Sequence, residues 1–423
     1  MLFLSRRCGI WTIAAAATLV MAGVGRDALA QTRLSPSLSV TERYDSNVFF
    51  GALGPGQIQE DFVTTISPQV MVTNKNSLFD AVVSGGATSE VYANNPGLNY
   101  VGFNASLNAV LDRAVQQVIK GSKLSITEAF RFTPQLPAFF APTDTGNALP
   151  PELVRGFQAA RANSYTITHG ATGGYAIGPG TNWTMGYTHS TIRFGQVFAQ
   201  PGSGGTFFTT TYQMVQSGLT HKITARDTVG LTYMYALTDF GESNTGVNRY
   251  DTHTVRGTYT RVLNPYWALS LGGGLVFLPP LDPNDPTAKS QITHVVDSSL
   301  TYRYQFTTAS LGYSRSVLPS VGVASAALRN DNITASVSQG FGPKWTASLT
   351  GNYGTATSDP AGVYSFTSYS YGGTLSYAFR RDQAMSLVGS ATFTRQEFIQ
   401  AFNNAGFSFD RNLAMLNLTA AWY

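Results

Sequence analysis

The chain has 423 residues, of which 12% are charged and 43% are hydrophobic, with a formal net charge of +4 at pH 7. So low a charged share argues against a coiled coil and a charge-rich disordered chain, since about 25% is usual. A mean hydropathy of −0.03 excludes a bundle of apolar transmembrane helices. The small net charge gives no reason to expect nucleic acid as a partner.

Residues 1–30 have the features of a secretory signal peptide. Arg6 and Arg7 form a short positive region, residues 10–24 form an apolar run, and Ala28-Leu29-Ala30 matches the small-x-small cleavage pattern. The apolar run is shorter than the roughly 20 residues that a spanning helix needs. We therefore expect cleavage after residue 30 and export of the mature chain. The alternative is an uncleaved membrane anchor.

The remainder of the chain, residues 31–423, repeats a pattern with a period of two. Apolar side chains alternate mostly with Ser, Thr, Asn, Gly or charged and amide residues over residues 101–111, 228–237, 296–306, 332–338, 345–353 and 368–379. This alternation is typical of β-strands with one apolar and one polar face. No later window supplies 18 consecutive apolar residues, so an exported chain of such strands is expected to cross a membrane as a closed barrel.

The connections between these strands alternate between tight turns and long loops. The tight ones, rich in Gly, Pro, Asn and Asp, fall at residues 74–77, 178–181, 224–227, 263–266, 341–344 and 380–382. The long ones fall at residues 133–161, 195–206, 241–247, 278–290, 358–363 and 398–407. In outer-membrane barrels, short turns face the periplasm and long loops face the outside.

Hairpin counting predicts an all-β, antiparallel, up-and-down transmembrane barrel of about 18 strands. An even number of strands returns both ends of the chain to the periplasmic side. The connections near residues 112–122 and 318–328 are irregular, and 16 strands is the alternative.

The last strand ends on an aromatic residue, Tyr423, and so resembles the C-terminal strand of bacterial outer-membrane proteins. It must pair with the first strand, because an open edge in lipid leaves backbone groups unpaired. Two apolar phases mix in this strand, which indicates a bulge or an atypical ending. One phase holds Leu416, Leu418 and Trp422, and the other holds Leu413, Met415 and Tyr423.

If the apolar face meets lipid, the opposite face lines the interior. The residues expected to line this pore are Arg43, Gln69, Asn104, Asn108, Lys123, Arg131, Arg256, Asp297, Arg303 and Gln305. Positive side chains outnumber negative ones in this set, which favours an anionic solute because a confined pore focuses the electric field. The alternative is that any water-filled barrel has polar walls, and that Arg–Asp pairs only brace it.

No arrangement of residues indicates catalysis, a metal site or a bound cofactor. The single cysteine, Cys8, lies in the signal peptide, which leaves no thiolate site in the mature chain. The five histidines lack the spacing of a zinc site, and each is expected to be a polar residue of the lumen or of the membrane interface. They are His169, His189, His221, His253 and His294. We therefore expect a protein that is not an enzyme.

Residues 42–49 read Glu-Arg-Tyr-Asp-Ser-Asn-Val-Phe, and residues 61–68 read Asp-Phe-Val-Thr-Thr-Ile-Ser-Pro. This pair of segments resembles the opening of the type-two family of β-barrel porins and related outer-membrane barrels of exopolysaccharide gene clusters. The resemblance implies a barrel that serves polysaccharide export or passive passage. The resemblance implies no catalytic residues.

These features together predict a single barrel in the outer membrane of a Gram-negative bacterium, in contact with membrane lipid and forming a passive hydrophilic pathway. The first expectation is export of polysaccharide or oligosaccharide, with periplasmic export machinery as a partner. The second is a general or substrate-selective diffusion porin for small solutes. The third is a non-conducting structural or surface-binding barrel.

Overall fold

A computed structural model of the chain describes residues 32–48, 59–133, 161–198, 209–239, 241, 249–280, 290–319, 327–359, 364–382, 384–402 and 405–423. The expected signal peptide lies outside these ranges, as does most of the longest expected loop, residues 134–160.

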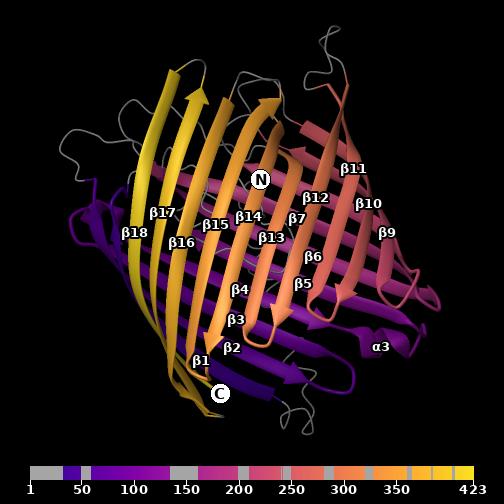
Figure 1. Cartoon of the computed structure of the whole chain (residues 1–423), viewed down its shortest axis with the longest axis horizontal. Helices are drawn as coiled ribbons and strands as arrows, with labels where there is room; N and C mark the ends of the chain where they lie inside the picture. Colours follow the sequence, from indigo (N-terminus) through magenta and orange to yellow (C-terminus); the bar gives the residue numbers. More distant parts are fainter. Residues whose placement is uncertain are drawn as a thin grey trace, which may run out of the picture.

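Eighteen strands of the described chain form one closed antiparallel barrel (Figure 1). The first nine are β1 (Thr32–Asp45), β2 (Asp61–Lys75), β3 (Asp80–Tyr92), β4 (Tyr100–Val110), β5 (Ser122–Thr133), β6 (Arg161–Gly178), β7 (Thr181–Phe198), β8 (Thr210–Lys222) and β9 (Asp227–Asp239). The other nine are β10 (Arg249–Asn264), β11 (Trp267–Leu278), β12 (Gln291–Tyr304), β13 (Thr307–Pro319), β14 (Ala327–Phe341), β15 (Trp345–Asp359), β16 (Tyr364–Arg381), β17 (Met385–Phe402) and β18 (Ala405–Trp422).

Each strand pairs with its neighbour in the chain, and β18 returns to pair with β1 from Ser37↔Ala421 to Asp45↔Leu413. The predicted barrel of 18 strands is therefore confirmed, and the alternative of 16 strands is wrong. The strands at the front and back of the barrel cross at a steep angle because all of them tilt relative to the barrel axis (Figure 1).

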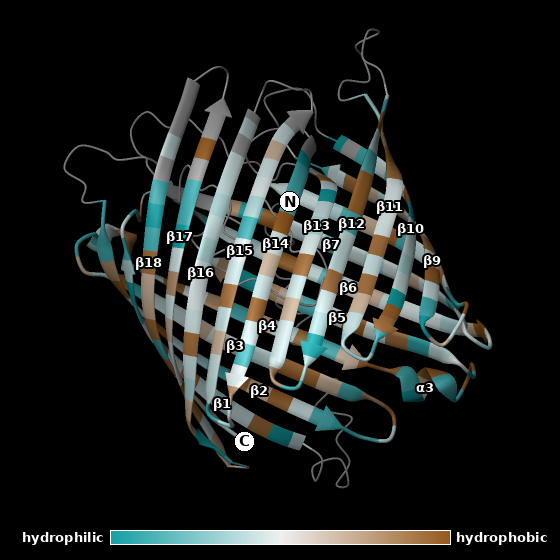
Figure 2. Cartoon of the chain, in the orientation of Figure 1, coloured by the Kyte–Doolittle hydropathy of each residue, from teal (hydrophilic) through white to brown (hydrophobic). Residues whose placement is uncertain are grey.

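The two faces of the sheet differ in polarity. Along β15, Trp345, Leu349 and Tyr353 are exposed on one face, and Ser348 and Asn352 point to the other. Figure 2 shows the same alternation of apolar and polar residues along the strands. A closed barrel with apolar side chains exposed on its outer face meets lipid there, and its polar face encloses the interior.

Aromatic pairs mark the two edges of this apolar band. Their ring centroids lie 4.6–5.3 Å apart. One edge carries Trp267–Tyr302 and Trp345–Tyr377, and the other carries Tyr44–Phe62, Phe132–Tyr165 and Tyr353–Tyr369. Such rings are typical of the two membrane–water interfaces of a transmembrane barrel.

The tight connections all lie at one end of the barrel, which we call the turn end; the opposite end is the loop end. The irregular connection after β4 also lies at the turn end, and it contains helix α3 (Asp112–Gln116). The Asp112 carboxylate accepts the Leu124 amide at 2.9 Å, which ties this helix to β5. A short 3-10 helix, η1 (Pro96–Leu98), lies at the loop end. Neither described helix is long and apolar enough to cross a membrane.

The strand expected over residues 296–306 ends earlier than its alternation indicates. The last register pair of this hairpin joins Tyr304 to Thr307, so Gln305 and Phe306 form a two-residue turn. Gln305 has φ +46°, the only positive φ at a non-glycine position in the described chain. The expectation that Gln305 lines the pore is therefore wrong. Neither residue is a usual turn former, so the sequence carried no turn signal here.

Replacing Gln305 with glycine is expected to raise the free energy of unfolding by about 1 kcal/mol, because left-handed backbone costs a residue with a Cβ roughly 1–2 kcal/mol. The matched change is Gly342→Ala in the next tight turn, where φ is +67° and no atom lies within 4 Å of an added Cβ. It is expected to lose a similar amount from backbone strain alone. Urea unfolding of the refolded barrel, followed by tryptophan fluorescence, measures both. A destabilising Gln305→Gly would contradict this account of the turn.

The final strand has no irregularity in its register. β18 pairs without a shift against both β17 and β1, so a bulge, the first of the two expected explanations, is absent. Leu416, Leu418 and Trp422 are exposed on the outer face, and Leu413 is fully buried on the inner face. The mixed apolar phase arises because Leu413 and Met415 lie in the inward phase, opposite Asp45 and Arg43.

The inner wall as the candidate functional site

An ion pair on the inner face bridges two strands that are not neighbours. Arg256 on β10 contacts Asp297 on β12, and both side chains cross over β11. The register places Gly274 opposite Arg256 and Gly272 opposite Asp297. This pair matches one of the two interpretations of the polar inner face, in which Arg–Asp pairs support the barrel.

Glycine is required beneath this bridge. A Cβ on Gly272 would lie 2.7 Å from Cγ of Asp297, and a Cβ on Gly274 would lie 2.8 Å from Cα of Arg256. Gly273 points to the outer face, where an added Cβ would come no closer than 4.0 Å to the Val295 oxygen. The Gly-Gly-Gly run of β11 thus gives the two charged side chains room to meet.

Gly272→Ala is expected to lower the free energy of unfolding by about 1–3 kcal/mol, since the added methyl displaces Asp297 from a packed position. Gly273→Ala is the matched control, and it is expected to stay within about 0.5 kcal/mol of the unchanged protein. Urea titration of the two variants tests the difference. Equal effects would contradict the packing of the bridge over Gly272.

A second group of charges, which we call the closure cluster, lies where β18 meets β1. It consists of Arg43, Asp45, Glu90 and Arg411. Nε of Arg411 donates to Oδ1 of Asp45 at 2.9 Å, and its Nη2 contacts the other carboxylate oxygen. Nη2 of Arg43 donates to Oε2 of Glu90 at 3.4 Å, and its Nε lies 3.9 Å from Asp45. All four side chains are at most 5% exposed.

Hydroxyl and amide side chains extend this contact toward the turn end. Nδ2 of Asn417 donates to Oγ of Ser39 at 2.7 Å and to Oγ1 of Thr41 at 2.6 Å. Oγ1 of Thr419 donates to the same serine at 3.1 Å. The β1–β18 register joins nine residue pairs, whereas β17–β18 joins 18. Side-chain hydrogen bonds therefore add to the short backbone pairing between β1 and β18, which closes the barrel.

Buried side chains of the inner face gather near the loop end on strand after strand. They include Arg43, Asp45, Val63, Glu90, Thr133, Ser164, Thr210, Thr238, Val276, Asn330, Ala356, Ser368, Thr394, Gln396 and Leu413. Toward the turn end, Gln69, Asn108, Lys123 and Arg303 on the same face are exposed. The inner wall is therefore closely packed toward the loop end and exposed toward the turn end.

The acidic groups of the described inner face are all engaged with other groups. Asp297 pairs with Arg256, Asp80 pairs with Arg113, and Asp61 accepts the Asn94 and Asn95 amides at 2.9 Å. The other two, Asp45 and Glu90, belong to the closure cluster. Lys123, Arg131 and Arg303 are exposed on this face. The accessible wall therefore presents an excess of positive charge.

Nine of the ten residues expected along the pore lie on strands in the inward phase, and Gln305 is the exception. The structure brings together Arg256 with Asp297, and it places Asn104 opposite Arg131 in the β4–β5 register. It does not gather the nine into one site, because they are spread over six strands. Sequence reasoning missed Asp45, Glu90 and Arg411, although each is a charged residue in the inward phase of a strand.

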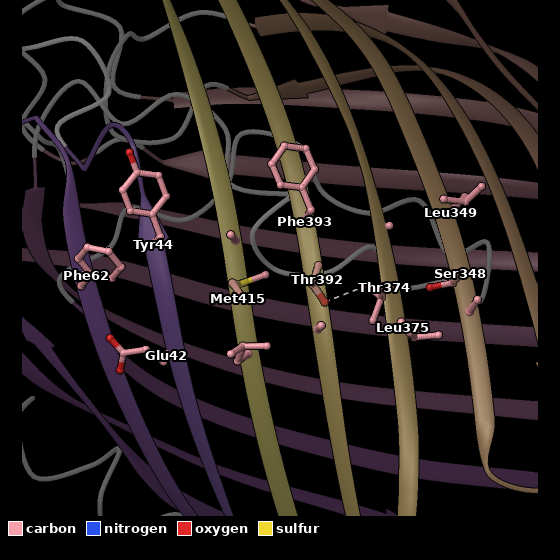
Figure 3. Close-up of a pocket in the computed structure, with 15 residues that line it drawn as sticks. Glu42, Tyr44, Phe62, Ser348, Leu349, Thr374, Leu375, Thr392, Phe393 and Met415 are labelled. Atoms are coloured by element: carbon pink, nitrogen blue, oxygen red, sulfur yellow. Dashed lines mark hydrogen bonds between the residues drawn. The ribbon is translucent and has the colours of Figure 1, made fainter.

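A groove of about 570 Å³ lies on the outer face, over β15–β18 and β1–β2 (Figure 3). Small residues, Ala347, Gly373, Ala391 and Ala414, form its floor, and Leu349, Leu375, Phe393 and Phe62 rise around it. Glu42 lies at one edge and accepts the Thr64 hydroxyl at 2.7 Å. Because this groove faces lipid, it is not part of a path through the barrel.

Comparison with solved structures finds outer-membrane proteins of two bacteria. Pseudomonas aeruginosa OccK2 (OpdF) is 11% identical with a TM-score of 0.48, over 93% of this chain and 98% of that chain. Acinetobacter baumannii OccAB3 is 12% identical with a TM-score of 0.49, over 93% and 99%. The outer membrane protein opdK from Pseudomonas aeruginosa is 12% identical with a TM-score of 0.46, over 92% and 99%.

No protein-family model matches the chain. The resemblance of residues 42–49 and 61–68 to the exopolysaccharide-cluster barrels therefore has no support beyond those two segments. No curated protein matches the chain either.

Proposed function

We propose that the chain is an outer-membrane diffusion channel for small polar solutes, with a preference for anions. The observation that carries the proposal is the inner wall, where exposed Lys123, Arg131 and Arg303 face a space enclosed by 18 strands. Barrels of 16–18 strands are wide enough to hold an aqueous channel. A channel wall with charges of one sign raises the local concentration of ions of the opposite sign, and this requires no catalytic step.

We favour passage of small solutes over polysaccharide export because buried side chains crowd the inner wall at the loop end. A polymer chain needs a continuous wide path, for which a crowded wall leaves less room. Hydroxyl and amide groups along the exposed part of the wall would replace part of the hydration of a small solute. By the arrangement of turns and loops, this exposed part lies toward the periplasm.

Single-channel recording of the refolded barrel in planar bilayers tests the proposal. We expect steady conductance, and a reversal potential in a potassium chloride gradient that indicates chloride preference. Small organic anions are expected to block the current more strongly than neutral sugars of equal size. A correctly folded barrel without conductance would overturn the channel proposal and favour a structural role. Block by long oligosaccharides alone would favour polysaccharide export instead.

A further inference from the structure

Four polar side chains lie in one register line on the outer face of β5 to β8. Glu128 is opposite His169, His169 is opposite His189, and His189 is opposite Gln213. We call these four residues the outer polar row. All five histidines of the chain are in the outward phase of their strands, so of the two places expected for them, the lumen and the membrane interface, the lumen is excluded.

Neighbouring residues establish which face carries the row. Tyr165, Tyr187 and Val215 are in the same phase as the row, and each is more than 40% exposed. Ser164 and Thr210 are in the opposite phase and are buried inside the barrel. The row therefore points away from the interior, among side chains that meet lipid.

The row also lies within the apolar band rather than at its edge. On β6, His169 comes between Tyr175 near the turn end and Tyr165 near the loop end. On β5, Glu128 comes between the apolar residues Ile126 and Phe130 of the same face. The row therefore lies among side chains of the apolar band.

The members of the row contact one another but remain accessible. Nδ1 of His169 contacts Oε2 of Glu128, and the two side chains are 34% and 22% exposed. The rings of His169 and His189 stack with centroids 5.8 Å apart, and Nε2 of His189 lies 3.3 Å from Oγ1 of Thr191. Hydrocarbon supplies no partner for the remaining donors and acceptors, so exposure to lipid alone is costly.

Polar groups continue from the row onto the next two strands. On β9 and β10, the Tyr233 hydroxyl lies 2.8 Å from Nδ1 of His253, and the Tyr235 ring lies 5.0 Å from the same imidazole. Over β11 to β15 the outer face carries Leu271, Leu300, Leu311, Val337 and Leu349, and it holds a second polar group on β12–β14. There Arg315 donates to Asp331 at 2.7 and 2.9 Å and contacts His294, so the two charges of that group pair with each other. The polar groups of β5–β10 extend over more strands, a sector of six neighbouring ones, and remain partly accessible.

We propose that the outer face of β5–β10 is an interface between copies of this chain in the membrane. The row holds a carboxylate that accepts hydrogen bonds, as well as imidazole and amide groups that donate them. One copy therefore offers the groups that another copy needs, as a self-complementary interface requires. Ala171 and Gly173, on the same face beside the row, allow close approach of a second barrel.

The size of the sector fits such an interface. Six strands about 4.8 Å apart and tilted by about 40° cover roughly 900 Å² of a band about 25 Å tall. A standard interface buries about 800 Å² on each partner. This assembly does not depend on which solute the barrel carries.

Single-cysteine crosslinking in native membranes tests the interface. With Cys8→Ser as the background, Ala171→Cys places one thiol beside the row, and Ala391→Cys places one on the outer face of β17 as the matched control. A short bis-maleimide is expected to give a product of twice the chain mass with Ala171→Cys and no product with Ala391→Cys. Equal products from both, no product from either, or a product containing a different protein would overturn the proposal.

A second variant separates association from folding. Replacing Glu128, His169 and His189 with leucine is expected to convert the detergent-extracted assembly to monomers. Folding of the barrel is checked independently by its heat-dependent gel mobility. If the row instead faces lipid, the same variant keeps the original oligomeric state and gains stability, and the proposal fails.

Discussion

Replacing Arg411 with alanine is expected to lower the free energy of unfolding by about 3–5 kcal/mol, the largest effect of any single substitution considered for this barrel. The change removes the two-point contact to Asp45 and leaves that carboxylate buried, with Arg43 3.9 Å away as its remaining cation in the closure cluster. A buried charge without its partner keeps its desolvation cost and loses the attraction that offset it.

Arg395→Ala is the matched control for this change. Nη2 of Arg395 lies 3.1 Å from Oδ2 of Asp410 near the same end of the barrel, but these side chains are 41% and 54% exposed. Exposed ion pairs contribute about 0–1 kcal/mol, so this variant is expected to unfold almost like the unchanged protein. Urea titration of both variants in lipid vesicles gives the comparison. Similar losses from the two would show that the closure cluster does not stabilise the seam.

The second large effect concerns ion preference. Replacing Lys123, Arg131 and Arg303 with glutamate is expected to reverse the sign of the reversal potential, lowering the chloride-to-potassium permeability ratio by roughly tenfold or more. These side chains are exposed on the inner face, whereas the acidic groups of the described inner face are paired or buried. Reversing three charges therefore changes the sign of the accessible wall.

Arg329→Glu provides a control on the outer face, where its Nη2 lies 3.5 Å from the Thr357 hydroxyl. It is expected to leave the reversal potential unchanged, because a charge outside the barrel is separated from the conducting path by the wall. Both sets are measured in planar bilayers under the same salt gradient, at low ionic strength where screening is weakest. An unchanged preference in the triple variant would show that these three residues do not set the selectivity.

The alternation of polarity was a reliable guide to the fold because strand periodicity is a local property. Side chains two residues apart share a face whatever the rest of the chain does, so Lys123, Arg256 and Arg303 were assigned to the inward phase from sequence alone. The turn at Gln305 escaped this reasoning because apolar alternation runs through it without Gly, Pro, Asn or Asp. Two residues in an unusual backbone conformation end that strand.

The partners of each charged side chain depend on strand register, which local patterns do not encode. Arg411 meets Asp45 from 366 positions away because the barrel closes, and Arg256 meets Asp297 because Gly272 and Gly274 leave room between them. The outer polar row appears only when β5 to β8 are aligned, since Glu128, His169, His189 and Gln213 belong to four separate strands. The sequence by itself determined the barrel and the side on which most residues lie, because both follow from a period of two and from even pairing. Only the tertiary structure decided which residues meet, because contacts between strands are set by register and closure over the whole chain.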